Sequence, residues 1–289
     1  MKRVLIIGCG DVALRVALLL KQNYKLFGLV RDRQRFAVLR AAGITPLAGN
    51  LDDHATLSRL SGMADIVLHF APPPDSGTRD QRTHHLLSAL SRGALPSRII
   101  YISTSGVYGD CAGARVNETH PLAPQSPRAQ RRVDAETQIR AWGQRHGVNA
   151  NILRVPGIYA SDRLPLGRLQ QGMPAIIAEQ DSYTNHIHAD YLARIVVATL
   201  RRGKPNRVYH TSDDSESKMG EYFDEVADAC HLPRPPRLPR IEVQRAVSPM
   251  MWSFMQESRR LTNARMKSEL KVQLIYPTVH DALKQEITF

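Results

Sequence analysis

The spacing of two glycines near the N-terminus is the clearest indication of a functional site in this chain. Gly8 and Gly10 stand between an apolar, strand-like run and an apolar, helix-like run, which is the order of a strand, a tight turn and a helix. Gly8 would allow the sharp turn, and Gly10 would leave no side chain between the backbone and a bound phosphate. Asp11 and Val12 would then open the helix and offer backbone N–H groups to that phosphate. The Gly-x-Gly-x-x-Ala pattern, completed by Ala13, therefore predicts a dinucleotide-binding turn.

A second signal lies where the next apolar strand ends, roughly 20 residues after the glycines, where such folds place the group that meets the adenosine ribose. Arg31 comes first there, and Asp32 follows. An acid would bind the 2′-hydroxyl of NAD, whereas a guanidinium suits the 2′-phosphate of NADP. We therefore expect NADP(H) in preference to NAD(H). In the alternative interpretation, Asp32 binds the ribose and Arg31 points to solvent.

Hydroxyl side chains follow a later apolar run, in the sequence Ser103-Thr104-Ser105-Gly106-Val107-Tyr108-Gly109. A hydroxyl at the carboxyl end of a strand, facing a nicotinamide, is placed to polarise a substrate carbonyl. Thr104 is therefore a candidate catalytic residue. The alternative is a turn in which the Ser and Thr side chains bond the local backbone.

These residues stand at strand ends in a chain that alternates strands and helices. The expected strands span 4–7, 24–30, 44–47, 66–70, 98–102 and 151–155. Strands that are apolar on both faces and separated by helices indicate a parallel sheet covered by helices on both sides. We therefore predict an α/β fold, a Rossmann-like doubly wound parallel sheet that binds its ligand at the carboxyl ends of the strands.

The same rule adds Asn50, Leu51 and Ala71, which follow the third and fourth strands, to the residues expected to bind the dinucleotide. The regular alternation weakens after residue 159. We predict an NAD(P)-binding domain over 1–159 and a smaller C-terminal substrate domain over 160–289, from which 185–211 returns to the main sheet.

Composition narrows the class of protein. The 289 residues carry a net charge of +12 and contain three cysteines. The cysteines form no Cys-x-x-Cys pair and no Cys/His cluster, so we expect reduced thiols, a cytoplasmic location and no metal site. No apolar run is long enough to span a membrane. The positive charge would attract phosphorylated ligands, and nucleic-acid binding ranks last because no nucleic-acid motif accompanies it.

In its motifs and their order, the chain resembles the extended short-chain dehydrogenase/reductases, the NAD-dependent epimerase/dehydratase group, over nearly its whole length. The matching positions are Thr104, 107–109, 124–127, Glu136, Arg154, 157–159 and 187–190. Two further stretches, 210–214 and 258–263, are similar to an atypical branch of that group. The resemblance implies a dinucleotide cofactor and hydride transfer at a carbonyl or alcohol carbon.

The chain departs from this group at the position of its general acid/base. Active members carry Tyr-x-x-x-Lys after the Ser-Pro pair, with the tyrosine exchanging the proton and the lysine on the nicotinamide ribose. The corresponding residues here are Arg128 and Arg132. Arg132 keeps a charge that can bind a ribose hydroxyl. Arg128 cannot exchange protons near neutral pH, because a guanidinium has a pKa above about 12.

By resemblance, Thr104 orients the substrate oxygen, and another group must supply the proton. Tyr108 is the nearest candidate in the sequence, and a water or the substrate itself are the others. A purely structural tyrosine is the alternative reading of Tyr108.

Two functions stay open. We favour an enzyme, either an NAD(P)-dependent oxidoreductase or a nucleotide-sugar epimerase/dehydratase; the alternative is a catalytically inactive protein that binds the dinucleotide and senses its redox state. The resemblance implies a small, anionic or nucleotide-linked substrate held by arginines of the second half. The candidates are Arg163, Arg168, Arg234, Arg237, Arg240, Arg245, Arg259 and Arg260. For the oligomeric state, we predict a homodimer.

Overall fold

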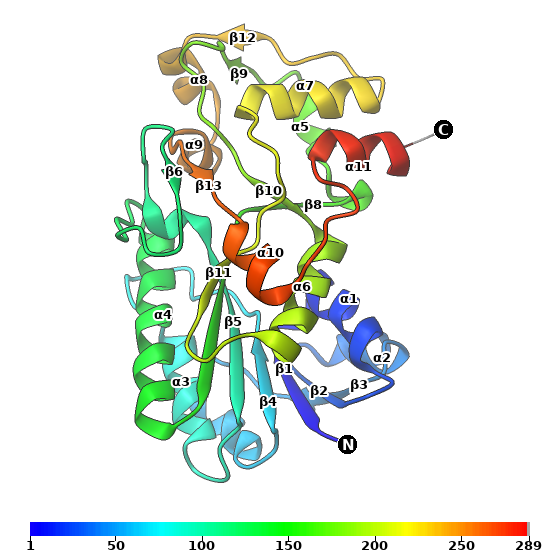
Figure 1. The fold of residues 1–289 in the computed structure, drawn as a ribbon, viewed down its shortest axis with the longest axis vertical. Coiled ribbons are helices and arrows are strands. Elements are labelled where there is room, and N and C mark those ends of the chain that lie inside the picture. Colours follow the sequence, from blue (N-terminus) through cyan, green and yellow to red (C-terminus); the bar gives the residue numbers. More distant parts are fainter. Residues whose placement is uncertain (288–289) are drawn as a thin grey trace.

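The computed structural model describes residues 1–287, which are organised around a seven-stranded sheet (Figure 1). Every strand pair in it is parallel. In sheet order the strands are β3 (Ile44–Ala48), β2 (Lys25–Val30), β1 (Arg3–Ile7), β4 (Ile66–His69), β5 (Arg98–Thr104), β7 (Asn149–Val155) and β11 (Val208–His210). This is the strand order of a Rossmann-like doubly wound fold, so the predicted fold class is confirmed.

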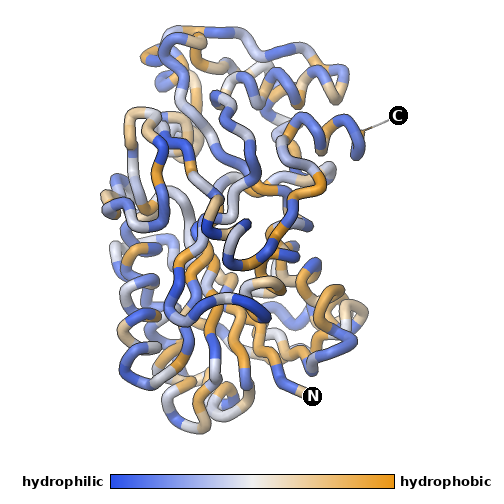
Figure 2. Tube along the Cα trace, viewed as in Figure 1, coloured by the Kyte–Doolittle hydropathy of each residue, from blue (hydrophilic) through white to orange (hydrophobic). Residues whose placement is uncertain are grey.

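Helices cover both faces of the sheet because its strands are apolar on both sides. On one face lie α1 (Asp11–Leu20), α2 (Phe36–Ala41), α6 (Ala189–Arg202) and α10 (Ala264–Leu270). On the other lie the 3-10 helix η2 (His54–Leu60), α3 (Gln81–Leu90) and α4 (Pro127–His146). The sheet therefore separates two apolar cores, and Figure 2 shows its strands as the hydrophobic centre of this part of the molecule.

A smaller part of the chain lies beyond the carboxyl ends of the strands (Figure 1). Its helices are α5 (Leu166–Gln170), α7 (Met219–Ala229), α8 (Arg240–Ala246), α9 (Pro249–Met255) and α11 (Val279–Glu286). Its short strand pairs are β8 (Gly157–Tyr159) with β10 (His186–His188), β9 (Ala175–Ile176) with β12 (Arg237–Leu238), and β6 (Arg115–Val116) with β13 (Arg260–Leu261). A third apolar core holds these five helices together.

Segment 185–211 contributes to both parts. Its first strand, β10, pairs with β8 outside the main sheet, whereas α6 covers the sheet and β11 extends it beside β7. The chain therefore crosses between the two parts more than once after residue 159. The division into 1–159 and 160–289 stays a prediction.

Within residues 1–287, no helix combines the length and the apolar character needed to cross a membrane. The same residues contain no group of three His, Cys, Asp or Glu side chains that could hold a metal ion. The three cysteines are free thiols.

Candidate cofactor cleft

The turn between β1 and α1 opens onto a cleft of about 670 Å³. The cleft lies at the change of strand order between β1 and β4, where doubly wound folds bind their ligands. Gly8 has a φ of +89°, and a Cβ there would stand 2.4 Å from the backbone nitrogen of Ala71, so only glycine fits. At Gly10 nothing lies within 4 Å of a Cβ position. The backbone of this turn therefore faces open space, which fits a bound dinucleotide phosphate.

Every residue that the sequence predicts to bind the cofactor lines this cleft. These residues are Gly8, Gly10, Asp11, Val12, Arg31, Asn50, Leu51, Ala71 and Arg132. Sequence reasoning did not assign Arg35, Arg82 or Arg163 to the cleft, and the structure places all three in its lining.

At the β2 side of the cleft, two arginines and one acid, Asp32, line the space. Arg31 follows β2 directly and is exposed, and Arg35 ends the 3-10 helix η1 (Arg33–Arg35). Asp32 caps this helix, because its Oδ1 accepts the backbone N–H of Gln34 at 2.8 Å. Two guanidiniums and one carboxylate therefore stand at this end of the cleft, which can bind an anionic group through the arginines.

Arg82 joins the loops that follow β3 and β4. Its Nε and Nη2 donate to the two carboxylate oxygens of Asp52, both at 2.7 Å. Nη1 donates to the carbonyl oxygens of Pro72 and Pro73 at 3.3 and 3.2 Å. The Arg82 guanidinium lowers the pKa of Asp52 below its usual range. No sequence signal links residues 30 positions apart, so only the fold shows this contact.

Arg132 is fixed at the carboxyl end of β5. Its helix, α4, begins after Ser126, whose Oγ accepts the backbone N–H of Ala129 at 3.2 Å. Nη1 of Arg132 donates to the carbonyl oxygen of Ile102 at 2.7 Å and to the hydroxyl of Tyr101 at 2.9 Å. Both contacts use the same nitrogen, so the guanidinium keeps further donors for a ribose hydroxyl in the cleft.

Thr104 is the last residue of β5. Ile102, two residues before it, lines the cleft. The Oγ1 of Thr104 accepts the backbone N–H of Gly106 at 3.3 Å, the local bond that the sequence left as the alternative. A buried carboxylate, which the sequence did not predict, also lies at this strand end. Oε2 of Glu257 stands 3.9 Å from the position of a Cβ on Gly106 and 2.8 Å from Nη1 of Arg259.

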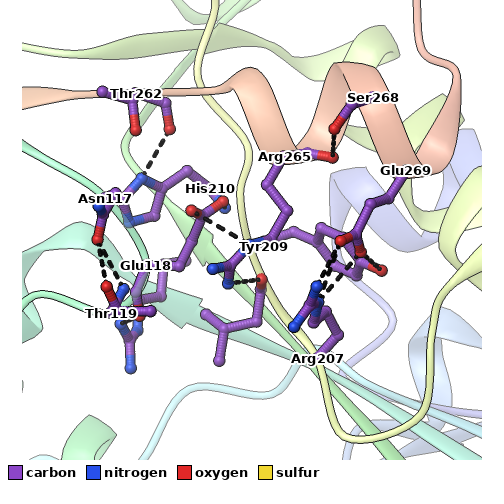
Figure 3. Close-up of polar contacts among 12 residues, drawn as sticks. Asn117, Glu118, Thr119, Arg207, Tyr209, His210, Thr262, Arg265, Ser268 and Glu269 are labelled. Carbon is purple, nitrogen blue, oxygen red and sulfur yellow. Dashed lines mark hydrogen bonds and ion pairs between the residues drawn. The ribbon is translucent and has the colours of Figure 1, made fainter.

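Tyr108 is buried, and its hydroxyl has partners on two sides. Nη1 of Arg154 donates to it at 2.6 Å, and it donates to Nε2 of His210 at 2.5 Å. Nδ1 of His210 faces the carbonyl oxygen of Thr262 at 2.9 Å (Figure 3), so Nδ1 carries the ring hydrogen and Nε2 accepts. Burial lowers the pKa of His210 to about 3 and keeps the ring neutral. These contacts favour the structural reading of Tyr108.

The two stretches that resemble the atypical branch, 210–214 and 258–263, contact each other. Nδ2 of Asn263 donates to the carbonyl oxygen of Ser212 at 3.0 Å and to Oδ1 of Asp214 at 2.8 Å. The backbone N–H of His210 donates to Oε1 of Glu118 at 3.1 Å (Figure 3). Both stretches therefore join the smaller part of the chain to the end of the main sheet.

Arg128, at the position of the expected tyrosine, packs against the smaller part of the chain. Its guanidinium carbon lies 4.1 Å from the ring centroid of Phe254 in α9, within the range of a cation–π contact. Phe254 is exposed and would otherwise leave its ring in solvent. The side chain at this position therefore contributes packing and positive charge but no proton.

Several arginines of the second half are already paired with acids. Arg234 binds Asp228 and Arg237 binds Asp224, each at 2.6 Å. Arg163 is the member of that predicted group that lines the cofactor cleft. Arg163, predicted to bind the substrate, therefore lies in the cleft of the dinucleotide turn.

The sequence profile of the NAD dependent epimerase/dehydratase family matches residues 13–212. A dTDP-glucose 4,6-dehydratase of Actinoplanes is 25% identical over 204 residues, covering 64% of this chain and 63% of the relative. One of Mycobacterium tuberculosis is 28% identical over 190 residues, covering 58% and 57%. The chain therefore spans about three fifths of the length of these relatives.

Solved structures match over nearly the whole chain. A conserved protein of unknown function from Silicibacter pomeroyi has a TM-score of 0.84 at 29% identity, covering 99% of this chain and 98% of its own. A dTDP-glucose 4,6-dehydratase of Streptomyces venezuelae, solved with NAD bound, has a TM-score of 0.78 at 20% identity, covering 99% and 96%, which shows the shared fold. With the profile match, these findings show that the chain belongs to the NAD-dependent epimerase/dehydratase family of extended short-chain dehydrogenase/reductases.

Proposed function

We propose that this chain is an oxidoreductase that binds NADP(H) in the cleft and moves a hydride to or from a carbonyl or alcohol carbon of a small anionic substrate. The observation that carries the proposal is the cleft, with a glycine turn open at Gly10 and with Arg31 and Arg132 on opposite sides of that turn in the sheet order. The NAD bound to the dehydratase of Streptomyces venezuelae supports a dinucleotide as the ligand.

The preference for NADP(H) rests on charge at the end of β2. Arg31, Asp32 and Arg35 all line the cleft there, and one oxygen of Asp32 caps the 3-10 helix η1. A 2′-phosphate would gain charge-assisted hydrogen bonds from these guanidiniums. The cap contact uses one oxygen of the Asp32 carboxylate, so the proposal of NADP(H) rests on the two guanidiniums and not on loss of this acceptor.

The nicotinamide, when bound, would supply or accept the hydride. Arg132 would hold a ribose hydroxyl with the donors that its contacts with Tyr101 and Ile102 do not use. Thr104 would orient the substrate oxygen from the end of β5. The proton would come from a water or from the substrate, because Arg128 stays protonated and the Tyr108 hydroxyl is shared between Arg154 and His210.

An anionic substrate fits the basic side chains around this strand end. Arg128 and Arg132 lie one helical turn apart on α4 and so share a face. A phosphate or carboxylate of a nucleotide-linked substrate would neutralise this charge, because the nearby buried Glu257 forms its ion pair with Arg259. A cytoplasmic location and a homodimer stay predictions of the sequence.

Turnover is the test of this proposal. The purified chain, mixed with NADPH and a panel of carbonyl compounds and nucleotide sugars, is expected to lose NADPH absorbance with at least one of them. Thr104→Ala should reduce that rate about 100-fold, as loss of a group that stabilises a developing oxyanion does, while NADPH binding is retained. Thr137→Ala, at an exposed threonine on α4, is the matched control and should leave the rate unchanged.

The redox-sensor alternative is favoured by one observation, the arginine packed on Phe254 where an acid/base tyrosine is expected. It predicts a different result in the same assay. The chain would bind one redox form of the dinucleotide much more tightly than the other and would turn over no compound in the panel.

A further inference from the structure

We infer that Arg163 binds the pyrophosphate of the dinucleotide and offsets the negative charge of Asp11 beside the turn. The inference rests on the proposed function, because it concerns the same cleft. Arg163 ends the 3-10 helix η4 (Ser161–Arg163), which follows β8 in the smaller part of the chain. Its side chain lines the cleft, and its Nη1 lies 2.9 Å from Oδ2 of Asp11.

Asp11 places a negative charge directly at the predicted phosphate site. It is the first residue of α1 and follows Gly10, the open glycine of the turn. A carboxylate here is favourable for the helix itself, yet it repels the two negative charges of a pyrophosphate. Efficient binding therefore requires a cation that offsets Asp11 and reaches the same space.

Among residues 1–287, Arg15 and Arg163 contact Asp11, but of these two only Arg163 lines the cleft. Arg15 donates its Nε to Asp11 at 3.0 Å, its Nη1 to Asp190 at 2.7 Å and its Nη2 to Asp162 at 3.1 Å. Its guanidinium is thereby surrounded by three carboxylates. The Arg163 side chain is 36% exposed and shows one ion pair, with Asp11. Arg163 is thus the cation that can turn from the carboxylate to a phosphate.

The Asp11–Arg163 pair also joins two distant parts of the chain. The residues are 152 positions apart, and the contact brings η4 of the smaller part to the glycine turn of the main sheet. A pyrophosphate bound by Arg163 would therefore be held from both sides of the cleft. Because NAD and NADP share this group, Arg163 should raise the affinity for both equally, unlike Arg31.

Calorimetric titration of the purified full chain with NADPH and with NADH tests the inference. Arg163→Leu should raise the dissociation constants of both by about tenfold or more, as loss of a charge-assisted bond does, without changing their ratio. Arg33→Leu removes an exposed arginine that does not line the cleft and should change neither. Unaltered affinities in Arg163→Leu, with normal binding by the unmodified chain, overturn the inference and leave the proposed function intact.

Asp11→Asn separates a ligand-binding role of Arg163 from a merely structural ion pair. The substitution removes the repulsive charge and releases Arg163, so both dinucleotides should bind more tightly. If the pair only fastens η4 to the turn, Asp11→Asn and Arg163→Leu will weaken binding alike, which contradicts the inference. If the unmodified chain binds neither dinucleotide, the inference and the proposed function fail together.

Discussion

At the scale of single residues, charged side chains at the end of β2 carry the proposed preference for NADP(H). Arg31, Asp32 and Arg35 line the cleft at the end of β2, and Asp32 also caps a 3-10 helix. Residue types alone left two readings of this strand end, because an arginine and an aspartate stand side by side. The cap contact engages one oxygen of Asp32 and leaves this residue in the cleft lining, so the choice between the two residues stays a prediction.

Arg31→Asp should reverse the preference for NADP. Loss of a charge-assisted bond and gain of a repulsive charge should weaken NADP(H) binding about 10- to 100-fold, with little change for NAD(H). The ratio of the two dissociation constants, measured by titration calorimetry, checks this. Arg33→Asp makes the same change at an exposed residue outside the cleft. Equal ratios in Arg31→Asp and the unmodified chain would refute this assignment of Arg31.

Tyr108→Phe should reduce stability rather than cofactor binding. The change leaves Nε2 of His210 without its donor and removes an acceptor of Arg154, both buried. An unsatisfied buried group of this kind costs about 1–3 kcal/mol of unfolding free energy. Chemical denaturation measures this loss, and NADPH titration should give an unchanged affinity. Unchanged stability together with lost turnover would instead assign Tyr108 to the chemistry.

At the level of elements, the features that depend on local signals could be predicted from the sequence. Strand ends and the glycine turn follow from apolar runs and from Gly8 and Gly10, because periodicity and turn chemistry act over a few residues. Arg82 and Arg163 were not assigned to the cleft, because contacts over 30 and 152 positions place them there. The engagement of Tyr108 by His210 is likewise a product of tertiary packing over 102 positions.

The connection from β11 to α7 contains a carboxyl group in an unfavourable environment. Asp213 is buried, its Oδ1 accepts the backbone N–H of Ser215 at 3.0 Å, and its own N–H donates to the carbonyl oxygen of His186 at 2.8 Å. Burial raises the pKa of Asp213 to about 7. The folded chain therefore keeps a proton on Asp213 up to a higher pH than the unfolded chain, in which an aspartate has a pKa near 3.9.

This raised pKa predicts a pH-dependent stability. The contribution of Asp213 to the free energy of unfolding is fully present below about pH 4 and is lost as the pH rises through 7. Asp213→Asn keeps an acceptor for Ser215 and removes the charge, so it should stabilise the chain at pH 8 by about 1–3 kcal/mol and far less at pH 5. Thermal unfolding at both pH values measures this, with Glu179→Gln at an exposed site as the control. A gain that is equal at both pH values would contradict the assignment.

For the whole molecule, the cleft is where its two parts meet. The main sheet supplies the glycine turn and Arg31, α4 supplies Arg132, and the segment after β8 supplies Arg163. The doubly wound order fixes the place of the cleft at the β1–β4 change of direction. The fold therefore accounts for the proposed dinucleotide binding more fully than for the chemistry, because Arg128 stands where the family resemblance predicts the proton-exchanging tyrosine.

Titration of NADPH into the unmodified chain and into Gly10→Val is the most direct test of dinucleotide binding at the glycine turn. Gly10 has an extended backbone, with φ −83° and ψ −162°, and open space around its Cβ position, so valine fits without strain. The account predicts saturable NADPH binding by the unmodified chain, and loss of that binding in Gly10→Val with an unchanged melting temperature. Equal NADPH affinity in the two proteins, or none in the unmodified chain, would contradict it.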